Sequence, residues 1–155
     1  MMMDDKAVLV DTNVLISATT PLRELHRAAL TVFNRWPNEG VILVTSSQIL
    51  REYLVVATRP VEVNGLGLSI SDALTNIGAF RGRLRLLPES EPSWNRLQTL
   101  IATYRCLGKQ IHDANVVATA LSSGVAKLVT ANVGDFSRFA TELEVIDLAT
   151  AAGPP

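Results

Sequence analysis

Cysteine and histidine are scarce in this chain of 155 residues, which has one cysteine and two histidines. The single cysteine, Cys106, excludes an internal disulfide, and the lack of any Cys-x-x-Cys pair argues against a structural zinc site. A lone thiol is typical of proteins from a reducing compartment, so we expect a cytoplasmic location.

Long apolar runs and a large charge of one sign are also missing. No apolar stretch approaches the ~20 residues that a membrane helix needs, and residues 1–6 are too few and too acidic for a secretion signal. The net charge of −1, from 14 basic and 15 acidic residues, argues against a strongly basic nucleic-acid binder but permits a local basic face. No Gly-rich phosphate-binding motif is present, which disfavours nucleotide-driven chemistry.

The composition is typical of a globular protein, with 48% apolar and 19% charged residues. The length suffices for one domain with a sizeable core. We therefore expect a single domain over residues 1–155, with an ordered core over about 6–147. Small residues and proline gather in the tail at 148–155, which we expect to fray.

Apolar runs that predict buried strands alternate with stretches of helical spacing along the whole chain. The expected strands are 6–11, 41–44, 86–87, 127–130 and 143–146. The expected helices are 14–18, 21–36 with Thr20 as its cap, 47–58 with Ser46 as its cap, 70–84, 92 to about 108, 114–122 and 136–139. This order predicts an α/β fold with a mainly parallel central sheet, right-handed crossovers and flanking helices.

The first expected strand ends in an acid. Asp11 follows Val10 at a strand-to-helix turn, and open α/β sheets bind ligands beyond the carboxyl ends of their strands. A helix cap or turn residue explains Asp11 equally well. The question is therefore whether other acids reach the same place.

A glutamate lies inside an otherwise apolar helix. Glu52 has apolar neighbours around most of the helix circumference, so the predicted helix has few other polar positions with which Glu52 could form a solvated face. It either pairs with Arg51 or Arg59, or it turns inward, where a carboxylate needs a partner or a metal ion.

Two further aspartates lie at element ends. Asp113 opens a predicted helix, either as its cap or on the buried side that it shares with Val116 and Val117. Asp135 follows the strand at 127–130, where ordinary turn chemistry is the alternative. Both lie where the carboxyl edge of the predicted sheet is expected.

Carboxylates that converge at one sheet edge repel one another, which raises their pKa values. A fold gains from such a cluster only when cations neutralise it. Clusters of oxygen ligands suit Mg²⁺ or Mn²⁺. Two such ions about 3.5–4 Å apart can clamp the attacking and leaving oxygens of a phosphodiester displacement.

The motifs around these acids resemble those of PIN-domain ribonucleases, and among them the VapC-type toxins of bacterial toxin–antitoxin pairs. They are Val10-Asp11-Thr12-Asn13-Val14-Leu15, Ile49-Leu50-Arg51-Glu52-Tyr53, His112-Asp113-Ala114, and Thr130-Ala131-Asn132 with Asp135-Phe136. They stand in family order over residues 10–136. The resemblance implies a three-layer PIN-like fold and a metal-dependent endoribonuclease that cuts single-stranded or loop RNA.

The resemblance also implies roles for single residues. Asp11 and Asp113 would bind Mg²⁺ or Mn²⁺, and Glu52 and Asp135 would bind a second ion or its waters. Attack by an activated water would leave a 5′-phosphate and a 3′-hydroxyl. The supporting residues that it implies are Thr12, Asn13, Asn132 and His112. The partners that it implies are an RNA substrate, a small antitoxin protein and a second copy of the chain.

Candidate RNA-binding residues are less clear from the pattern. Arginines cluster at Arg81, Arg83 and Arg85, and isolated basic residues stand at Arg59, Arg105 and Lys109. Each is either a contact to phosphate or part of a solvated helix face. The RNA-binding candidates are Arg59, Arg81, Arg85 and Lys109.

Two other functions fit part of the pattern. A doubly wound phosphatase with an aspartate nucleophile is one, but such enzymes usually need a second aspartate where this chain has Asn13. A non-catalytic RNA-binding or protein-binding PIN module is the other. The presence of all four acids argues against that second alternative.

Overall fold

A computed structural model describes residues 5–151 of the chain. Five strands form one sheet in the order β3-β2-β1-β4-β5, and every neighbouring pair is parallel. The strands are β1 (Ala7–Val10), β2 (Ile42–Ser46), β3 (Arg85–Leu87), β4 (Lys127–Thr130) and β5 (Glu144–Asp147). The expected parallel sheet is therefore confirmed, as are the places of all five strands.

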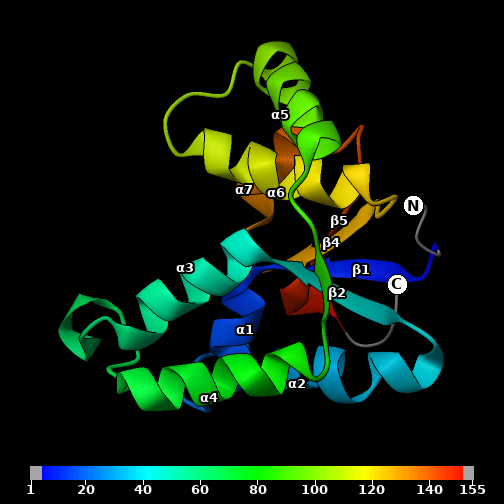
Figure 1. The fold of residues 1–155 in the computed structure, drawn as a ribbon. Coiled ribbons are helices and arrows are strands. Elements are labelled where there is room, and N and C mark those ends of the chain that lie inside the picture. Colours follow the sequence, from blue (N-terminus) through cyan, green and yellow to red (C-terminus); the bar gives the residue numbers. More distant parts are fainter. Residues whose placement is uncertain (1–4, 152–155) are drawn as a thin grey trace.

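Helices cover both faces of this sheet and make the three expected layers. Helices α5 and α6 lie on one face, and α1, α2 and α4 lie on the other (Figure 1). The α-helices are α1 (Thr12–Thr19), α2 (His26–Asn34), α3 (Ser47–Thr58), α4 (Ile70–Arg81), α5 (Glu91–Tyr104), α6 (Gln110–Ser122) and α7 (Val133–Phe136). Short 3-10 helices are η1 (Trp36–Glu39), η2 (Val61–Val63), η3 (Ser137–Phe139) and η4 (Leu148–Thr150).

The central strand β1 is buried along its whole length, as its unbroken apolar run predicts. The chain leaves β1 toward β2 on one side, and β4 pairs with β1 on the other. The strand order thus reverses direction between β1 and β4. In open parallel sheets, ligands bind beyond the carboxyl ends of the strands at such a switch point.

The second helix begins later than the sequence predicts. Thr20 does not cap a helix; its hydroxyl accepts from the backbone N–H of Leu22 at 3.3 Å, and turns fill the chain up to α2. The proline motif at 20–21 therefore starts a turn, which leaves Leu22 94% exposed. The predicted helix over 21–36 is correct only for α2.

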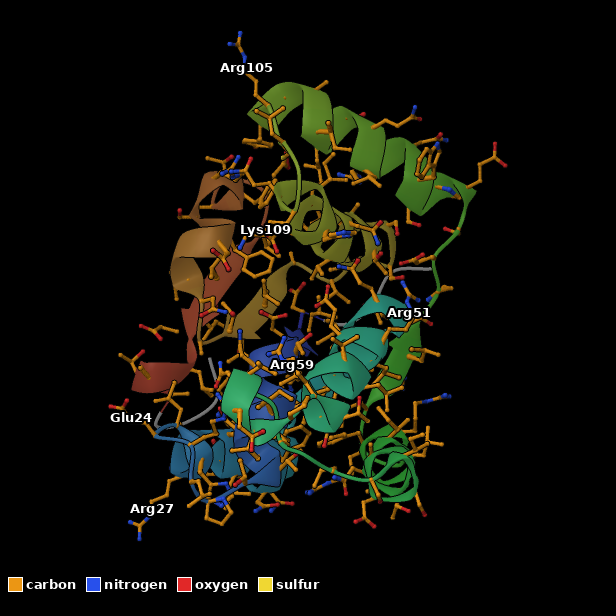
Figure 2. All side chains as sticks on the ribbon, turned by 90° about the vertical axis from the view of Figure 1, so that its left-hand side faces the viewer. Glu24, Arg27, Arg51, Arg59, Arg105 and Lys109 are labelled. Carbon is orange, nitrogen blue, oxygen red and sulfur yellow. The ribbon has the colours of Figure 1, made fainter. Side chains whose placement is uncertain are left out.

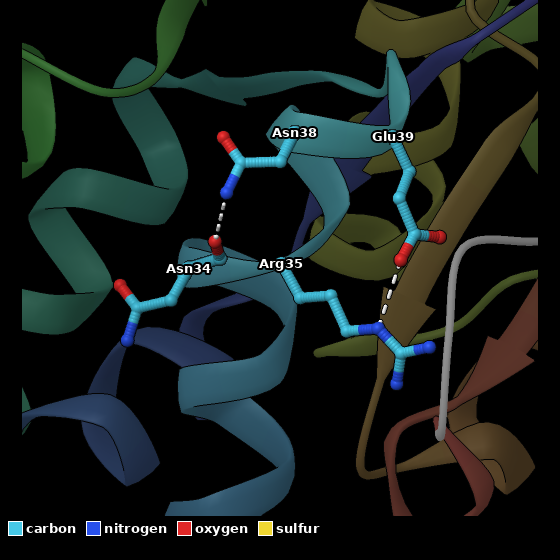
Figure 3. Close-up of polar contacts among 4 residues, drawn as sticks. All are labelled: Asn34, Arg35, Asn38 and Glu39. Atoms are coloured by element: carbon cyan, nitrogen blue, oxygen red, sulfur yellow. Dashed lines mark hydrogen bonds and ion pairs between the residues drawn. The ribbon is translucent and has the colours of Figure 1, made fainter.

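The junction between α2 and η1 positions the start of β2. Asn38 donates from Nδ2 to the carbonyl of Asn34 at 3.1 Å, and Arg35 Nε pairs with Glu39 Oε1 at 2.8 Å (Figure 3). Exposed pairs of this spacing contribute about 0.3–0.5 kcal/mol. Gly40 then ends η1 with φ +92°, a left-handed conformation that favours glycine.

The tail is ordered further than expected. Leu148 is fully buried in η4, and Asp147 caps this turn by accepting from the N–H of Ala149 at 3.0 Å. Residues 148–150 thus form a turn whose apolar side chain packs into the core, within the segment that we expect to fray. Residues 1–4 and 152–155 lie outside the described part, so neither the rest of the tail nor the amino terminus is assessed. Within 5–151, no helix combines the length and hydropathy needed to cross a membrane.

The loop between α3 and α4 folds back on the end of α3. Gly65 N–H donates to the carbonyl of Pro60, and Gly67 N–H donates to that of Arg59, both at 2.9 Å. A Cβ atom at Gly65 would overlap the backbone carbonyl of Arg59. The close approach of these two segments therefore requires glycine at position 65.

We expect Gly65→Ala to lower the free energy of unfolding by more than about 1 kcal/mol, because the loop must move away from Arg59. Gly78→Ala is the matched control, since a Cβ there meets nothing within 4 Å in the interior of α4. That variant should gain about 0.5–1 kcal/mol of stability. Urea unfolding of both variants measures the difference, and equal stabilities would contradict the packing of this loop.

Candidate active site

A pocket of about 540 Å³ opens at the carboxyl edge of the sheet, beside the end of β1. The four predicted acids all line it, and they come from four different elements. Asp11 lies at the start of α1, Glu52 on α3, Asp113 on α6 and Asp135 on α7. Figure 2 faces this side of the molecule, with α5 at the top and α4 at the bottom. The fold thus brings together acids that are far apart in the sequence.

Asp11 is 6% exposed, and three groups hold its carboxylate. Oδ1 accepts from the N–H of Thr12 at 2.8 Å, so Asp11 is also the N-cap of α1. Oδ2 accepts from Asn13 Nδ2 at 3.0 Å and from Thr130 Oγ1 at 2.8 Å. The cap interpretation is therefore correct, and it is compatible with a second role in the pocket.

Thr130 and Asn13 join the ends of β1 and β4. Asn13 Nδ2 donates to Thr130 Oγ1 at 3.1 Å, and Asn13 Oδ1 accepts from the N–H of Ala131 at 2.8 Å. Sequence reasoning did not propose Thr130 as a site residue. Its signal was its place as the last residue of a parallel strand, which puts it beside the end of β1.

Glu52 is held by a chain of polar side chains. It accepts from Thr12 Oγ1 at 3.0 Å and from Gln48 Nε2 at 2.8 Å. Gln48, itself 5% exposed, also donates to the carbonyl of His112 at 3.0 Å and accepts from Asn115 Nδ2 at 2.7 Å. This chain links α3 to α6 and fixes the direction of the Glu52 carboxylate. The spacing of four residues between Gln48 and Glu52 was the available signal for this contact.

The arginine alternative for Glu52 is wrong. Arg51 is exposed, and Arg59 donates instead to the carbonyl of Asn64 at 3.4 Å. Glu52 is half-buried and faces the pocket. The carboxylate of Glu52 therefore turns toward the pocket, which is the second of the two expected alternatives.

Asp113 is not the cap of its helix. Helix α6 begins at Gln110, four residues before the expected start, so Asp113 lies in its first turn. It is half-buried, and Val116 and Val117 on the same helix are buried. The adjacent His112 has an exposed side chain that is not part of the pocket lining, and only its carbonyl takes part.

The fourth acid lies in a helix rather than in a loop. Asp135 is exposed in the first turn of α7, and its side chain lines the pocket with that of Asn132. The N–H of Asn132 donates to Thr130 Oγ1 at 3.0 Å, which ties this turn to the end of β4. Both side chains stand at the open side of the pocket.

Burial and mutual repulsion raise the pKa values of two of these acids. Burial raises the pKa of Asp11 to about 6 despite the hydrogen bonds from Thr130 and Thr12, and the charge of Glu52 adds to the rise. Burial also raises the pKa of Asp113 to about 6, with further rises from Asp135, Asp11 and Glu52 in that order. The four carboxylates therefore act on one another electrostatically, as expected for a cluster that needs a cation.

The oxygen donors of the pocket suit hard divalent cations that keep part of their shell of waters. Among residues 5–151, no three His, Cys, Asp or Glu side chains are arranged to hold one ion together. Mg²⁺ usually takes one or two carboxylates and completes its shell with waters and substrate phosphates. Four oxygen-donor side chains spread around one pocket suit that kind of binding better than a closed protein cage.

The predicted RNA-binding residues are divided between two regions. Arg59 lines the acidic pocket, and Lys109 lies close enough to Asp113 to lower its pKa. Arg81 and Arg85 line a separate pocket with Ile42, at the amino end of β2. The structure therefore does not bring Arg81 and Arg85 together with the acids.

Two other arginines from the sequence analysis have other places. Arg83 donates to the carbonyl of Phe33 at 2.7 Å and packs over its ring, so it holds α2 in place. Arg105 is exposed at the end of α5, with φ +52°. Arg23 was missed by sequence reasoning and lines the acidic pocket. It lies in the turns before α2, where the sequence predicts a helix, so its direction did not follow from the pattern.

Comparison with known families identifies the class of this fold. The family model for the PIN domain matches residues 7–134, which is most of the chain. The chain therefore belongs to the PIN domain family. No curated protein sequence matches it significantly.

Solved structures with this fold include components of toxin–antitoxin pairs. VapBC2 from Rickettsia felis bound to a DNA fragment from its promoter aligns with TM-score 0.67 and 16% identity, over 91% of this chain and 98% of that chain. VapBC-1 from nontypeable Haemophilus influenzae aligns with TM-score 0.64 and 23% identity, over 93% and 99%. VapC20 of Mycobacterium tuberculosis, a Sarcin-Ricin loop cleaving toxin, aligns with TM-score 0.55 and 15% identity, over 78% and 86%. At these identities the likeness establishes the fold.

The raised pKa values predict how stability depends on pH. The folded protein holds protons on Asp11 and Asp113 up to about pH 6, whereas the unfolded chain releases them near its ordinary value of 3.8. The free energy of unfolding of the metal-free protein should therefore fall as the pH rises from about 4 to about 6, because the folded protein binds more protons than the unfolded chain over this range.

Urea unfolding of Asp113→Asn across this pH range measures the contribution of one of these groups. The variant should show a shallower fall than the unmodified protein and a higher stability above about pH 6. Glu144→Gln, on an exposed position of β5, is the control. An equally steep fall in Asp113→Asn would contradict the raised pKa of Asp113.

Proposed function

We propose that this protein is a metal-dependent endoribonuclease that cuts single-stranded or loop RNA and acts as the toxin of a toxin–antitoxin pair. The observation that carries the proposal is the pocket itself, where four carboxylates from four elements meet at the switch point of a PIN fold. Two of them have pKa values raised by burial and by one another. Such a cluster is stabilised by divalent cations, which serve phosphodiester cleavage.

In this mechanism Asp11 and Asp113 would hold one Mg²⁺ or Mn²⁺, and Glu52 and Asp135 would hold a second ion or its waters. A bound divalent ion lowers the pKa of a water and neutralises charge on the phosphate. Thr130 and Asn13 keep the Asp11 carboxylate turned toward the pocket.

Other side chains around the pocket orient the remaining groups. Thr12 and Gln48 hold Glu52 in place through their hydrogen bonds. Asn132 stands at the open side of the pocket, where it can orient the substrate. Water would attack the scissile phosphate in line and lose a proton to solvent, and the bond from phosphorus to the 3′-oxygen would break. The 3′-oxygen would take up a proton, so the products would carry a 5′-phosphate and a 3′-hydroxyl.

The first test is Asp11→Asn with Mg²⁺ and a mixture of RNAs. Asparagine is as good an N-cap as aspartate, so α1 should keep its start. We expect cleavage to fall by at least about 100-fold, because a principal ligand loses its charge. Asp72→Asn, on an exposed position of α4, should cut like the unmodified protein. Sequencing of the RNA ends measures cleavage by both variants. Undiminished cleavage by Asp11→Asn would remove Asp11 from the mechanism.

An aspartate-nucleophile phosphatase is less well supported. Asn13 replaces the second aspartate that such enzymes need, and both ends of its amide are engaged in hydrogen bonds. A covalent phosphate on Asp11, detected by mass spectrometry, would support this alternative. A non-catalytic PIN module would bind RNA but leave it intact, with or without Mg²⁺.

The proposed biological setting includes partners. Its support is that fold relatives occur in VapBC complexes, and that a groove of about 490 Å³ adjoins the acidic pocket. The groove shares Arg23 and Asn64 with the pocket, and Leu22 is exposed in it. We propose a small cognate antitoxin, a homodimer and a cytoplasmic location.

Purification from the native host under mild conditions tests these partners. A small protein should copurify with the chain, and light scattering of the isolated chain should give twice its mass of 16.8 kDa. Isolation of the native protein alone and as a monomer would contradict both.

A further inference from the structure

Two arginines from separate parts of the chain meet at the rim of the acidic pocket. Arg23, in the turns before α2, donates from Nη2 to the carbonyl of Asn64 at 3.3 Å. Arg59, at the end of α3, donates from Nη2 to the same carbonyl at 3.4 Å. Both side chains line the cavity that the four acids line. One backbone oxygen thus holds two guanidinium groups side by side.

The carbonyl that gathers them is built into a well-packed loop. Asn64 has φ +62°, a left-handed conformation, and its N–H donates to the carbonyl of Val61 at 3.1 Å. Just beyond it, Leu66 N–H donates to the carbonyl of Val56 at 3.0 Å, and Gly65 packs against the backbone of Arg59. The packing of this loop therefore fixes the carbonyl that holds the two arginines together.

The charges of this pair are not balanced by carboxylates. Among the described residues, neither Arg23 nor Arg59 forms an ion pair, although Glu24 and the four acids line the same cavity. Arg59 Nε is buried and has no hydrogen-bond partner among these residues. A guanidinium carries five N–H donors, and each of these two forms one hydrogen bond among the described residues, to the carbonyl of Asn64. Two adjacent like charges with open donors gain from an anion that bridges them.

The position of Arg59 distinguishes it from the other basic residues on this face. In Figure 2 it lies near the centre, whereas Arg27 and Arg105 project outward at the edges of the molecule. Arg27 and Arg51 are exposed and are not part of the pocket lining. They therefore provide matched arginines of the same charge outside the cavity.

We propose that Arg23 and Arg59 form a phosphate subsite that holds a backbone phosphate of the RNA strand beside the scissile one. This inference rests on the proposed function, which gives the RNA strand the cavity that acids and arginines share. Planar guanidinium groups match phosphate oxygens in pairs. A strand held here has one phosphate at the carboxylates and a neighbouring phosphate at the arginines, which sets its direction across the pocket.

An RNA oligonucleotide labelled with a fluorophore tests the subsite by anisotropy. The Asp11→Asn background keeps the strand intact. Into it are placed Arg23→Gln, Arg59→Gln and the double variant, with Arg27→Gln and Arg51→Gln as controls. Each single variant should raise Kd several-fold, and the double variant should make the slope of log K against log salt shallower by about 0.7, the value for one phosphate contact on a single strand. The controls should bind like the background.

A second arm identifies the phosphate and separates charge from folding. One neutral methylphosphonate is placed at successive positions of the strand. At one position it should weaken binding to the background variant, and at that same position it should not weaken binding to the double variant. Arg59→Lys should recover part of the affinity, and thermal unfolding of each variant checks the loop. The subsite would be overturned if each methylphosphonate weakened binding to the background and binding to the double variant by the same factor.

The outcomes separate this inference from the proposed function. If the unmodified protein cleaves RNA but Arg23 and Arg59 variants bind like the controls, the subsite is wrong and the nuclease stands. If binding depends on the pair but the unmodified protein leaves RNA intact, the nuclease is wrong, and the pair is a phosphate-binding site with no scissile phosphate beside it. If the pair serves only a glutamate-rich peptide and not the oligonucleotide, the assignment to RNA is wrong.

Discussion

The hydrogen bond between Thr130 Oγ1 and Asp11 Oδ2, at 2.8 Å, is the contact on which the site depends. It joins two residues 119 positions apart, at the ends of two adjacent parallel strands. It can form only when β1 and β4 pair in register and end at the same edge. Asn13 bonds to both of these residues, so one small network closes the switch point of the sheet.

The other three acids reach the same pocket on helices. Gln48 aims Glu52 by bridging α3 to the backbone of α6. Asp113 stands in the first turn of α6, above buried valines that fix the face of that helix. Burial and, after it, repulsion among the acids raise the pKa values of Asp11 and Asp113 and lower the stability of the metal-free fold. A site that gathers charge at the expense of stability is typical of function.

The strands and the four acids of the pocket were predictable from the sequence, because apolar runs and the acids that follow them are easily recognised. The apolar runs before Asp11 and at 127–130 located β1 and β4, and parallel topology then placed their ends together. The start of α2 was not predictable, because Thr20 can cap a helix or a turn and only tertiary packing decides. The sequence did not indicate that Arg81 and Arg85 lie away from the acids, because charge alone does not show which sheet edge a helix end reaches. Arg23 lies in turns where the sequence predicts a helix, so only the folded loop around Asn64 reveals its direction.

The central claim is that these carboxylates form a divalent-cation site. Crystals soaked in Mn²⁺ test it directly through the anomalous scattering of the ion. The account predicts a manganese peak in the pocket between Asp11 and Asp113, and no such peak in crystals of Asp11→Asn. A manganese peak outside this pocket, or an equal peak in the variant, would contradict it.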